Sequence, residues 1–495
     1  MRYLPAAFIV VSLAVVFAMS PGCGGSDSDT SDAGGTEPDA GTADTGPGGG
    51  TVTLEDGTHQ GPMTVAAGGT LKAANPGGAT VENDKGAVII VETAPGKTTT
   101  VSGLKVKSAG GAAILVKGSG DFTGDNLDVA CTKGLGIAAE GAANFALSST
   151  SISGNITPDQ IPNLYFPLKG TEYPIIGTIV SKTTKVTLTD VTVTGFGGFG
   201  AVFVASNGSW DRGAVTGNVG VGIMQSGGTL NVSDVKIDGT QAGERGMAIF
   251  SYGMVAANKA ALSTDHVEIA DNKGFGILQE DSSSSHDGLK LNRNTEVGLW
   301  VQKSPGTVSA PSLVVKGEGS ELNENKGGGI FAIESGGIDI SAASLSRAVV
   351  KKITAGETGL VEMADGLQVS NLTGDLKVNN ASFADNTRIG VLLSGTPAPG
   401  ANVTFDGVTI SGASQYGLLG VEGFTVGAGW GVTKDPSLAE VDTNFTGTLG
   451  VASATSKVPS LGKVESSGLI GGSGIVSESG DVTQAASVGE HGLGE

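Results

Sequence analysis

A short repeat runs through most of the 495 residues of the chain. Its mark is a glycine followed by a short apolar segment, at Gly61, Gly86, Gly111, Gly136, Gly177, Gly200, Gly222, Gly246, Gly276, Gly298, Gly329, Gly366, Gly390 and Gly417. The spacing clusters between 22 and 25 residues, and longer spacings are typical of the same unit carrying an insertion. Because one unit of this size cannot bury its own apolar row, successive units must stack to form a continuous core.

The middle of each unit carries a second pattern. Two short segments of alternating apolar and polar residues are separated by a two-residue bend, as in Val186–Val193 and Leu230–Ile237. This alternation predicts two strands with one buried face each. The bend residues are mostly types that tolerate left-handed backbone angles, namely Asp190, Asp234, His266, Asn380 and Gly407. The next glycine then begins a third strand.

Three strands per unit, a tight bend at Asn or Asp and about 22 residues per unit resemble the right-handed parallel β-helix of the pectate-lyase-like superfamily. The resemblance covers residues 51–425 and implies an all-β, single-chain solenoid of about 14 coils. A propeller blade is about twice as long as this repeat, and a sandwich needs antiparallel hairpins that the pattern lacks. A leucine-rich repeat needs a Leu/Asn spacing that is missing.

Both ends of the chain differ from the repeat. Residues 1–22 combine a basic start, an apolar run and small residues, which predicts an export signal. Gly22-Cys23 resembles the end of a bacterial lipobox, which implies a lipid on Cys23 and anchoring to a membrane; a soluble secreted protein is the alternative. Residues 23–50 are acidic without a base and predict a disordered tether, and residues 426–495 predict a cap with partial coils and a Gly/Ser-rich tail.

These ends predict an exported lipoprotein of the cell envelope. The resemblance is to lipoproteins of myxobacteria-like Gram-negative bacteria. The expected destination is the outer membrane, because the residue after Cys23 is Gly24 and not Asp.

Charge and cysteine content exclude other classes. The chain has 29 Lys and Arg against 49 Asp and Glu, a net charge of −20, which is the wrong sign for a nucleic-acid partner. Two cysteines cannot make a disulfide scaffold. No metal or cofactor motif occurs, so we expect no cofactor beyond adventitious Ca²⁺ at acidic corners.

Enzymes of this fold usually carry charged catalytic residues on the outer face of the strand after the glycine. The second residue after each glycine should lie on that face. That row contains no ionisable residue: Ala138, Val202, Met224, Ala248, Leu278, Trp300, Phe331, Gln368, Leu392 and Leu419. Such an apolar stripe is large for a soluble monomer. Either the insertions 155–176 and 338–362 cover it, or it is a binding surface centred on Leu278, Trp300 and Phe331.

A weaker pattern offers catalytic candidates. Glu280 and Glu334 follow their glycines by four or five residues, so they could line the same cleft together with Arg245. Two carboxylates on coils two steps apart would suit a glycosidase; solvated corner residues are the alternative. Asp281 with the run Ser282 to Ser285 is interpreted as a turn, and His286 is isolated.

The sequence therefore favours a non-catalytic envelope lipoprotein, a rigid β-helical rod used for binding or structure at the cell surface or in the periplasm, with an envelope protein or polysaccharide as the possible partner. The alternative is a polysaccharide lyase or glycoside hydrolase of the pectate-lyase-like superfamily. Fold alone does not choose between them. The apolar stripe, on the face where catalytic charges are expected, favours the first interpretation.

Overall fold

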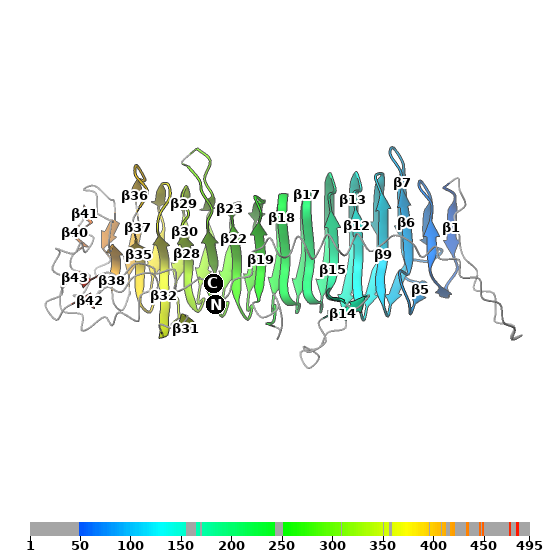
Figure 1. Ribbon diagram of the computed structural model, residues 1–495, viewed down its shortest axis with the longest axis horizontal. Coiled ribbons are helices and arrows are strands. Elements are labelled where there is room, and N and C mark those ends of the chain that lie inside the picture. The colour runs from blue at the N-terminus through cyan, green and yellow to red at the C-terminus, as the bar shows by residue number, and fades with distance from the viewer. Residues whose placement is uncertain are drawn as a thin grey trace, which may run out of the picture. The chain divides into compact units, whose positions relative to one another are not determined.

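The computed structural model describes residues 49–154, 165–168, 171–242, 251–307, 309–349, 351–355, 359–395, 397–406, 408–411, 416–420, 432–434, 445–446, 448–449, 475–476 and 482–484. Over these residues the regular elements are all strands. No helix in this part of the chain is long and apolar enough to cross a membrane. The chain forms a right-handed parallel β-helix (Figure 1), as the resemblance predicts. It divides into an N-terminal unit, up to Gly197 with Val202–Asn207, and a C-terminal unit, Gly198–Ala201 and from Gly208 onward.

Each coil contributes one strand to each of three parallel sheets, named A, B and C in chain order. In the N-terminal unit, sheet A holds β1 (Thr51–Leu54), β4 (Thr70–Ala73), β7 (Thr98–Ser102) and β10 (Asp121–Asp125). Sheet B holds β2 (Gly57–Gln60), β5 (Ala79–Asn83), β8 (Lys105–Ser108) and β11 (Asp128–Cys131). Both sheets receive β13 (Asn144–Gly154) and β16 (Lys185–Thr194). Sheet C holds β3 (Met63–Val65), β6 (Ile89–Thr93), β9 (Gly111–Gly118), β12 (Gly134–Glu140) and β15 (Thr171–Ser181), whose start pairs antiparallel with β14 (Tyr165–Leu168).

In the C-terminal unit, β18 (Val219–Asp238) runs through all three sheets. Sheet A continues with β20 (Ala261–Asp265), β23 (Ser283–Asp287), β26 (Leu313–Lys316), β29 (Ile338–Ser341), β33 (Leu376–Asn379) and β36 (Val403–Asp406). Sheet B continues with β21 (Glu268–Ala270), β24 (Lys290–Asn292), β27 (Ser320–Asn323), β30 (Ala343–Ser346), β34 (Ser382–Ala384), β37 (Val408–Ser411) and β39 (Val432–Lys434).

Sheet C of this unit holds β19 (Tyr252–Ala257), β22 (Phe275–Glu280), β25 (Leu299–Gln302), β28 (Gly327–Ile333), β32 (Gly359–Ser370), β35 (Ile389–Ser394) and β38 (Tyr416–Gly420). The start of β32 pairs antiparallel with β31 (Lys351–Ala355). β17 (Gly197–Thr216) has residues in both units. The short pairs β40 (Phe445–Thr446) with β41 (Thr448–Leu449), and β42 (Ile475–Val476) with β43 (Val482–Gln484), are antiparallel.

The bends between sheets A and B follow the sequence prediction. Asp190, Asp234, His266 and Asn380 have φ of 53°, 51°, 51° and 47°, so each turns the chain through the left-handed region. Side chains on the flanking strands alternate between the inside and the outside of the coil. The alternating sequence pattern therefore sets which residues enter the core.

The repeated glycine is explained by close stacking of coils. A Cβ at Gly253 would lie 2.7 Å from the carbonyl oxygen of Gly276, and one at Gly276 would lie 2.4 Å from that of Gly298. The sequence pattern predicts Gly246 as the anchor of this coil, and that prediction is wrong. Tyr252, Met254 and Val255 pair with β18, so the anchor is Gly253.

The early anchors are also shifted, because Gly134 and not Gly136 pairs with Gly111. The cause of both errors is that glycine is frequent enough for two candidates to fall within a few residues of each other.

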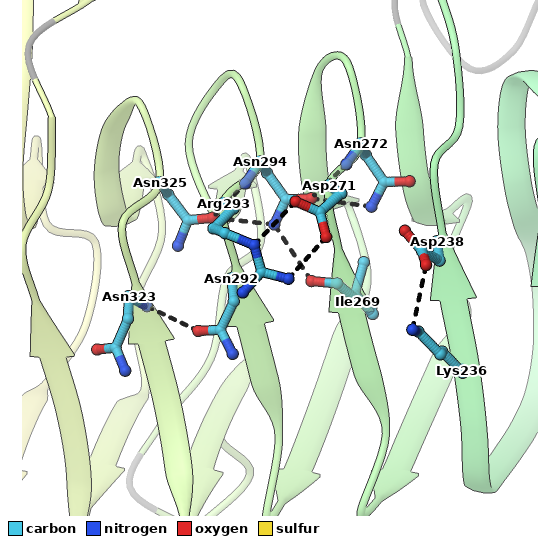
Figure 2. A network of polar contacts seen from close by, with 10 residues as sticks. All are labelled: Lys236, Asp238, Ile269, Asp271, Asn272, Asn292, Arg293, Asn294, Asn323 and Asn325. Atoms are coloured by element: carbon cyan, nitrogen blue, oxygen red, sulfur yellow. Dashed lines mark hydrogen bonds and ion pairs between the residues drawn. The ribbon is translucent and has the colours of Figure 1, made fainter.

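The corner between sheets B and C is held by a buried row of asparagines (Figure 2). The Asn272 side-chain amide donates to the Asn294 side-chain oxygen at 2.8 Å, and the Asn294 amide donates to the Asn325 oxygen at 2.9 Å. All three are buried. Because Asn272 and Asn294 each donate to the equivalent side-chain oxygen of the next coil, the row fixes the register in which the coils stack.

Candidate functional site

The outer face of sheet C carries the apolar row predicted from the sequence. Strand register aligns Leu278 with Trp300 and Trp300 with Phe331, and places Val255 where the sequence pattern predicts Ala248. The Trp300 and Phe331 rings are 4.4 Å apart between centroids. The Trp300 ring nitrogen donates to Gln302 at 3.0 Å. The row is thus a continuous apolar layer.

This layer is buried. The exposed fractions of Leu278, Trp300 and Phe331 are 8%, 3% and 1%. Because these side chains are covered, a partner could contact them only after they became exposed. The binding surface expected at these three residues stays a prediction.

A buried ion pair in the same sheet joins Asp365 of β32 to Arg388, the residue before β35. Arg388 contacts Asp365 through two nitrogens, with Nε donating to Oδ1 at 2.8 Å, and the two side chains are 3% and 2% exposed. The repeat pattern does not predict this pair, because it assigns outward positions only after each glycine, whereas Asp365 and Arg388 precede Gly366 and Gly390. A buried, bidentate pair of this kind is a structural contact and offers no free carboxylate.

The catalytic candidates Glu280 and Glu334 do not share a row. Glu280 ends β22 and pairs with Gln302 of the next coil. Glu334 lies at the corner between sheets C and A with φ of 49°, in the same corner position as Lys303 and Asp281. No hydrogen bond or ion pair joins the two glutamates within the described residues. Arg245, like Cys23, lies outside the described residues.

A different feature opens on sheet A of the same coils. A groove of about 380 Å³ crosses β18, β20, β23 and β26, and is lined by Thr229, Asn231, Ala261, Leu262, Ser263, Ser283, Ser284, Ser285, Pro311 and Val314. Strand register places Asn231, Ser263, Ser285 and Val314 in one outward row, which forms the floor. The sequence interpretation of Ser282 to Ser285 as a turn is corrected here, because Ser283–Asp287 is the strand β23.

An insertion shapes one end of the groove. Only Asp281 and Ser282 connect β22 to β23, whereas residues 303–312 connect β25 to β26. This longer connection closes on itself, because the Thr307 amide donates to the Ala310 carbonyl at 3.0 Å and the Ala310 amide donates back at 3.2 Å. It brings Pro311 to the groove. The long spacing between Gly298 and Gly329 indicates that this coil carries an insertion, but it does not show where the insertion lies.

A buried polar network supports the floor from inside. The Ser284 hydroxyl donates to Gln279 Oε1 at 2.5 Å, and the Gln279 amide donates to the carbonyls of Ser282 and Ser312 at 2.8 and 2.9 Å. His286 lies between Thr264 and Ser284, at 2.8 Å from Thr264 Oγ1 and 2.9 Å from Ser284 Oγ.

The network also sets the protonation of His286. Because the Ser284 proton goes to Gln279, Ser284 accepts from the Nε2–H of a neutral ring. Burial lowers the pKa of His286 to about 3, so the ring stays neutral. Polar atoms that hold one another in this way give the floor of the groove a fixed shape.

The charged residues beside the groove are paired. Asp265 lies 2.7 Å from His266 Nδ1, and the Lys316 ammonium lies 3.8 Å from Asp287. Within the described residues no group of three or more His, Cys, Asp or Glu could hold a metal ion. What the groove offers is hydroxyl and amide groups beside small apolar surfaces.

Comparisons with known proteins find similarity to solved structures alone. No protein-family model matches the chain, and no curated protein matches it. It is similar to the A-module of mannuronan C-5 epimerase AlgE6 from Azotobacter vinelandii, with 13% identity over 74% of this chain and 91% of that one, at a TM-score of 0.42. It is also similar to a mannuronic-acid-specific polysaccharide family 6 lyase from human gut microbiota, with 9% identity over 78% and 86% at 0.34.

A third similar structure is the periplasmic alginate epimerase AlgG, with 14% identity over 78% of this chain and 82% of that one, at a TM-score of 0.27. With all three scores below 0.5, the fold assignment depends on the strand pairing and not on these likenesses.

Proposed function

We propose that this β-helix binds a polysaccharide in the groove on sheet A, without cleaving it. The observation that carries the proposal is the groove itself. Its floor repeats Asn231, Ser263 and Ser285 on successive coils, so hydroxyl and amide groups recur at the strand spacing of about 4.8 Å. Hydroxyl-rich polymers are recognised by many modest hydrogen bonds of this kind, together with contacts to their C–H surfaces.

Binding is favoured over catalysis by the chemistry of the lining. None of its ten residues is an acid, a base or an aromatic ring, so the groove supplies neither of the two carboxyl groups that glycoside hydrolysis needs. Glu280 and Glu334, the candidates from the sequence, belong to other positions of the coil.

The location at the envelope is part of the same proposal. The export signal in residues 1–22 and the lipobox-like Cys23 support it. A binding protein anchored there through a lipid and the tether 23–50 would meet polysaccharides of the cell surface.

Affinity electrophoresis in gels that contain polysaccharides tests the proposal. We expect retardation by at least one polymer, and we expect Ser285→Trp, which fills the groove, to weaken it about tenfold or more. Ser344→Trp is the matched control, because Ser344 is also half-buried and outward-facing, but on sheet B. Equal retardation of both variants would refute the groove as the site. Release of reducing ends or unsaturated products by the wild type would favour a hydrolase or lyase instead.

A further inference from the structure

We infer that the groove on sheet A selects a neutral polysaccharide over a polyuronate, with the polymer lying across the strands along the stack of coils. This inference rests on the proposed function and adds the class of ligand and its direction. It depends on three features of the groove: the charge of its lining, the pairing of its neighbours and the order of its floor.

The lining carries no charge. Its polar members are serine, threonine and asparagine, and the rest are Ala261, Leu262, Pro311 and Val314. A uronate carboxylate placed there would lose water without gaining a guanidinium or ammonium partner. A neutral sugar loses much less, because hydroxyl groups exchange their water for the hydroxyl and amide groups of the floor.

The neighbouring charges do not change this. The nearest outward row contains Asp265, Asp287 and Lys316. Lys316 contacts Asp287, and Asp265 contacts His266, so the Lys316 ammonium beside the groove already has a carboxylate partner on the protein. A polyuronate would have to compete with these contacts and would face the same aspartates.

The floor also gives a direction. Asn231, Ser263 and Ser285 supply polar groups on three successive strands, and Val314 with Pro311 supplies an apolar surface on the fourth. A polysaccharide that lay along one strand would contact only one residue of this row. A chain that crosses the strands meets all four, and its polar edge and C–H face each find a matching surface.

Matched pairs of polymers test the inference in the intact protein. The probes are dextran and carboxymethyl-dextran, methyl-esterified and de-esterified homogalacturonan, and hydroxyethyl- and carboxymethyl-cellulose, at 0.15 M and 0.5 M salt. We expect the neutral member of a retained pair to bind at least about tenfold more tightly at both salt concentrations. Stronger binding of a carboxylated member that Ser285→Trp abolishes would overturn the inference while leaving the proposed function standing.

A charge placed on the floor gives a second measurement. Ser263→Arg adds a bidentate partner for carboxylates, and we expect it to strengthen binding of the carboxylated member about tenfold. Ser344→Arg on sheet B is the control and should leave both affinities unchanged. An equal change in both variants would contradict the inference. If no pair retards the protein, or if Ser285→Trp leaves retardation intact, the proposed function fails as well.

Discussion

On the same coils of the C-terminal unit, the outer faces of sheets A and C carry contrasting side chains. On sheet C, Leu278, Trp300 and Phe331 follow one another in register and are at most 8% exposed. On sheet A, Ser263 and Ser285 occupy the equivalent outward row and line a groove. The two rows differ in side-chain volume and polarity. The large apolar side chains on sheet C are covered, whereas the small polar ones on sheet A leave a surface that a ligand can enter.

The largest expected effect tests whether the layer on sheet C is structural. Trp300→Ala should lower the free energy of unfolding by about 3–5 kcal/mol, because it removes a buried ring and its contact with Phe331. Ser285→Ala on the floor of sheet A should change it by less than about 0.5 kcal/mol. Urea unfolding followed by circular dichroism measures both. A loss below about 1 kcal/mol for Trp300→Ala would reverse the comparison and favour the docking surface predicted from the sequence.

The next expected effect is a pH dependence of stability that comes from His286, on the inner face of sheet A. His286 contacts Thr264 and Ser284, and both of these groups are uncharged. Burial lowers the pKa of His286 to about 3. Below pH 6.5 the unfolded chain binds a proton that the folded chain does not. The free energy of unfolding therefore falls as pH falls from 6.5 toward 3, by about 3 kcal/mol between pH 6.5 and pH 4.

The measurement is the urea midpoint against pH for the wild type and His286→Gln. Part of the pH slope should disappear in His286→Gln, whatever the stability of this variant at pH 7. Identical slopes in the two proteins would mean that the ring is hydrated, and that the network does not hold the floor of the groove.

The two faces differ in how far the sequence predicts them. The three-strand coil, the left-handed bends at Asp234 and His266, and the outward position of Trp300 follow from patterns within about ten residues. Each of these depends on local backbone preference or on strand alternation, which a sequence displays directly. The repeat itself was enough to predict the fold.

The groove and its network were not predictable in this way. Thr264 and His286 are 22 residues apart, and they meet only because the register stacks them. The groove depends on Pro311 and on the small volume of Ser263 and Ser285, none of which belongs to a motif. The buried pair of Asp365 and Arg388 is a similar case, since both residues precede their glycines and lie outside the segment for which the repeat predicts side-chain directions.

The smallest expected effect concerns the corner between sheets B and C. There, buried amide contacts and an exposed ion pair are made by neighbouring residues (Figure 2). Asn294→Ala removes the acceptor of the Asn272 amide and should lower the free energy of unfolding by about 2 kcal/mol, because buried donors lose their partners. Arg293 donates to Asp271 at 2.9 Å and lowers the pKa of that carboxyl, but both side chains are about half exposed. Arg293→Ala should therefore lose less than about 1 kcal/mol, and the loss should vanish at 1 M salt. Urea midpoints at low and high salt measure both variants. A loss for Arg293→Ala as large as that for Asn294→Ala at both salt concentrations would contradict this comparison, because Arg293 would then contribute as much to the register of the coils as the buried amides do.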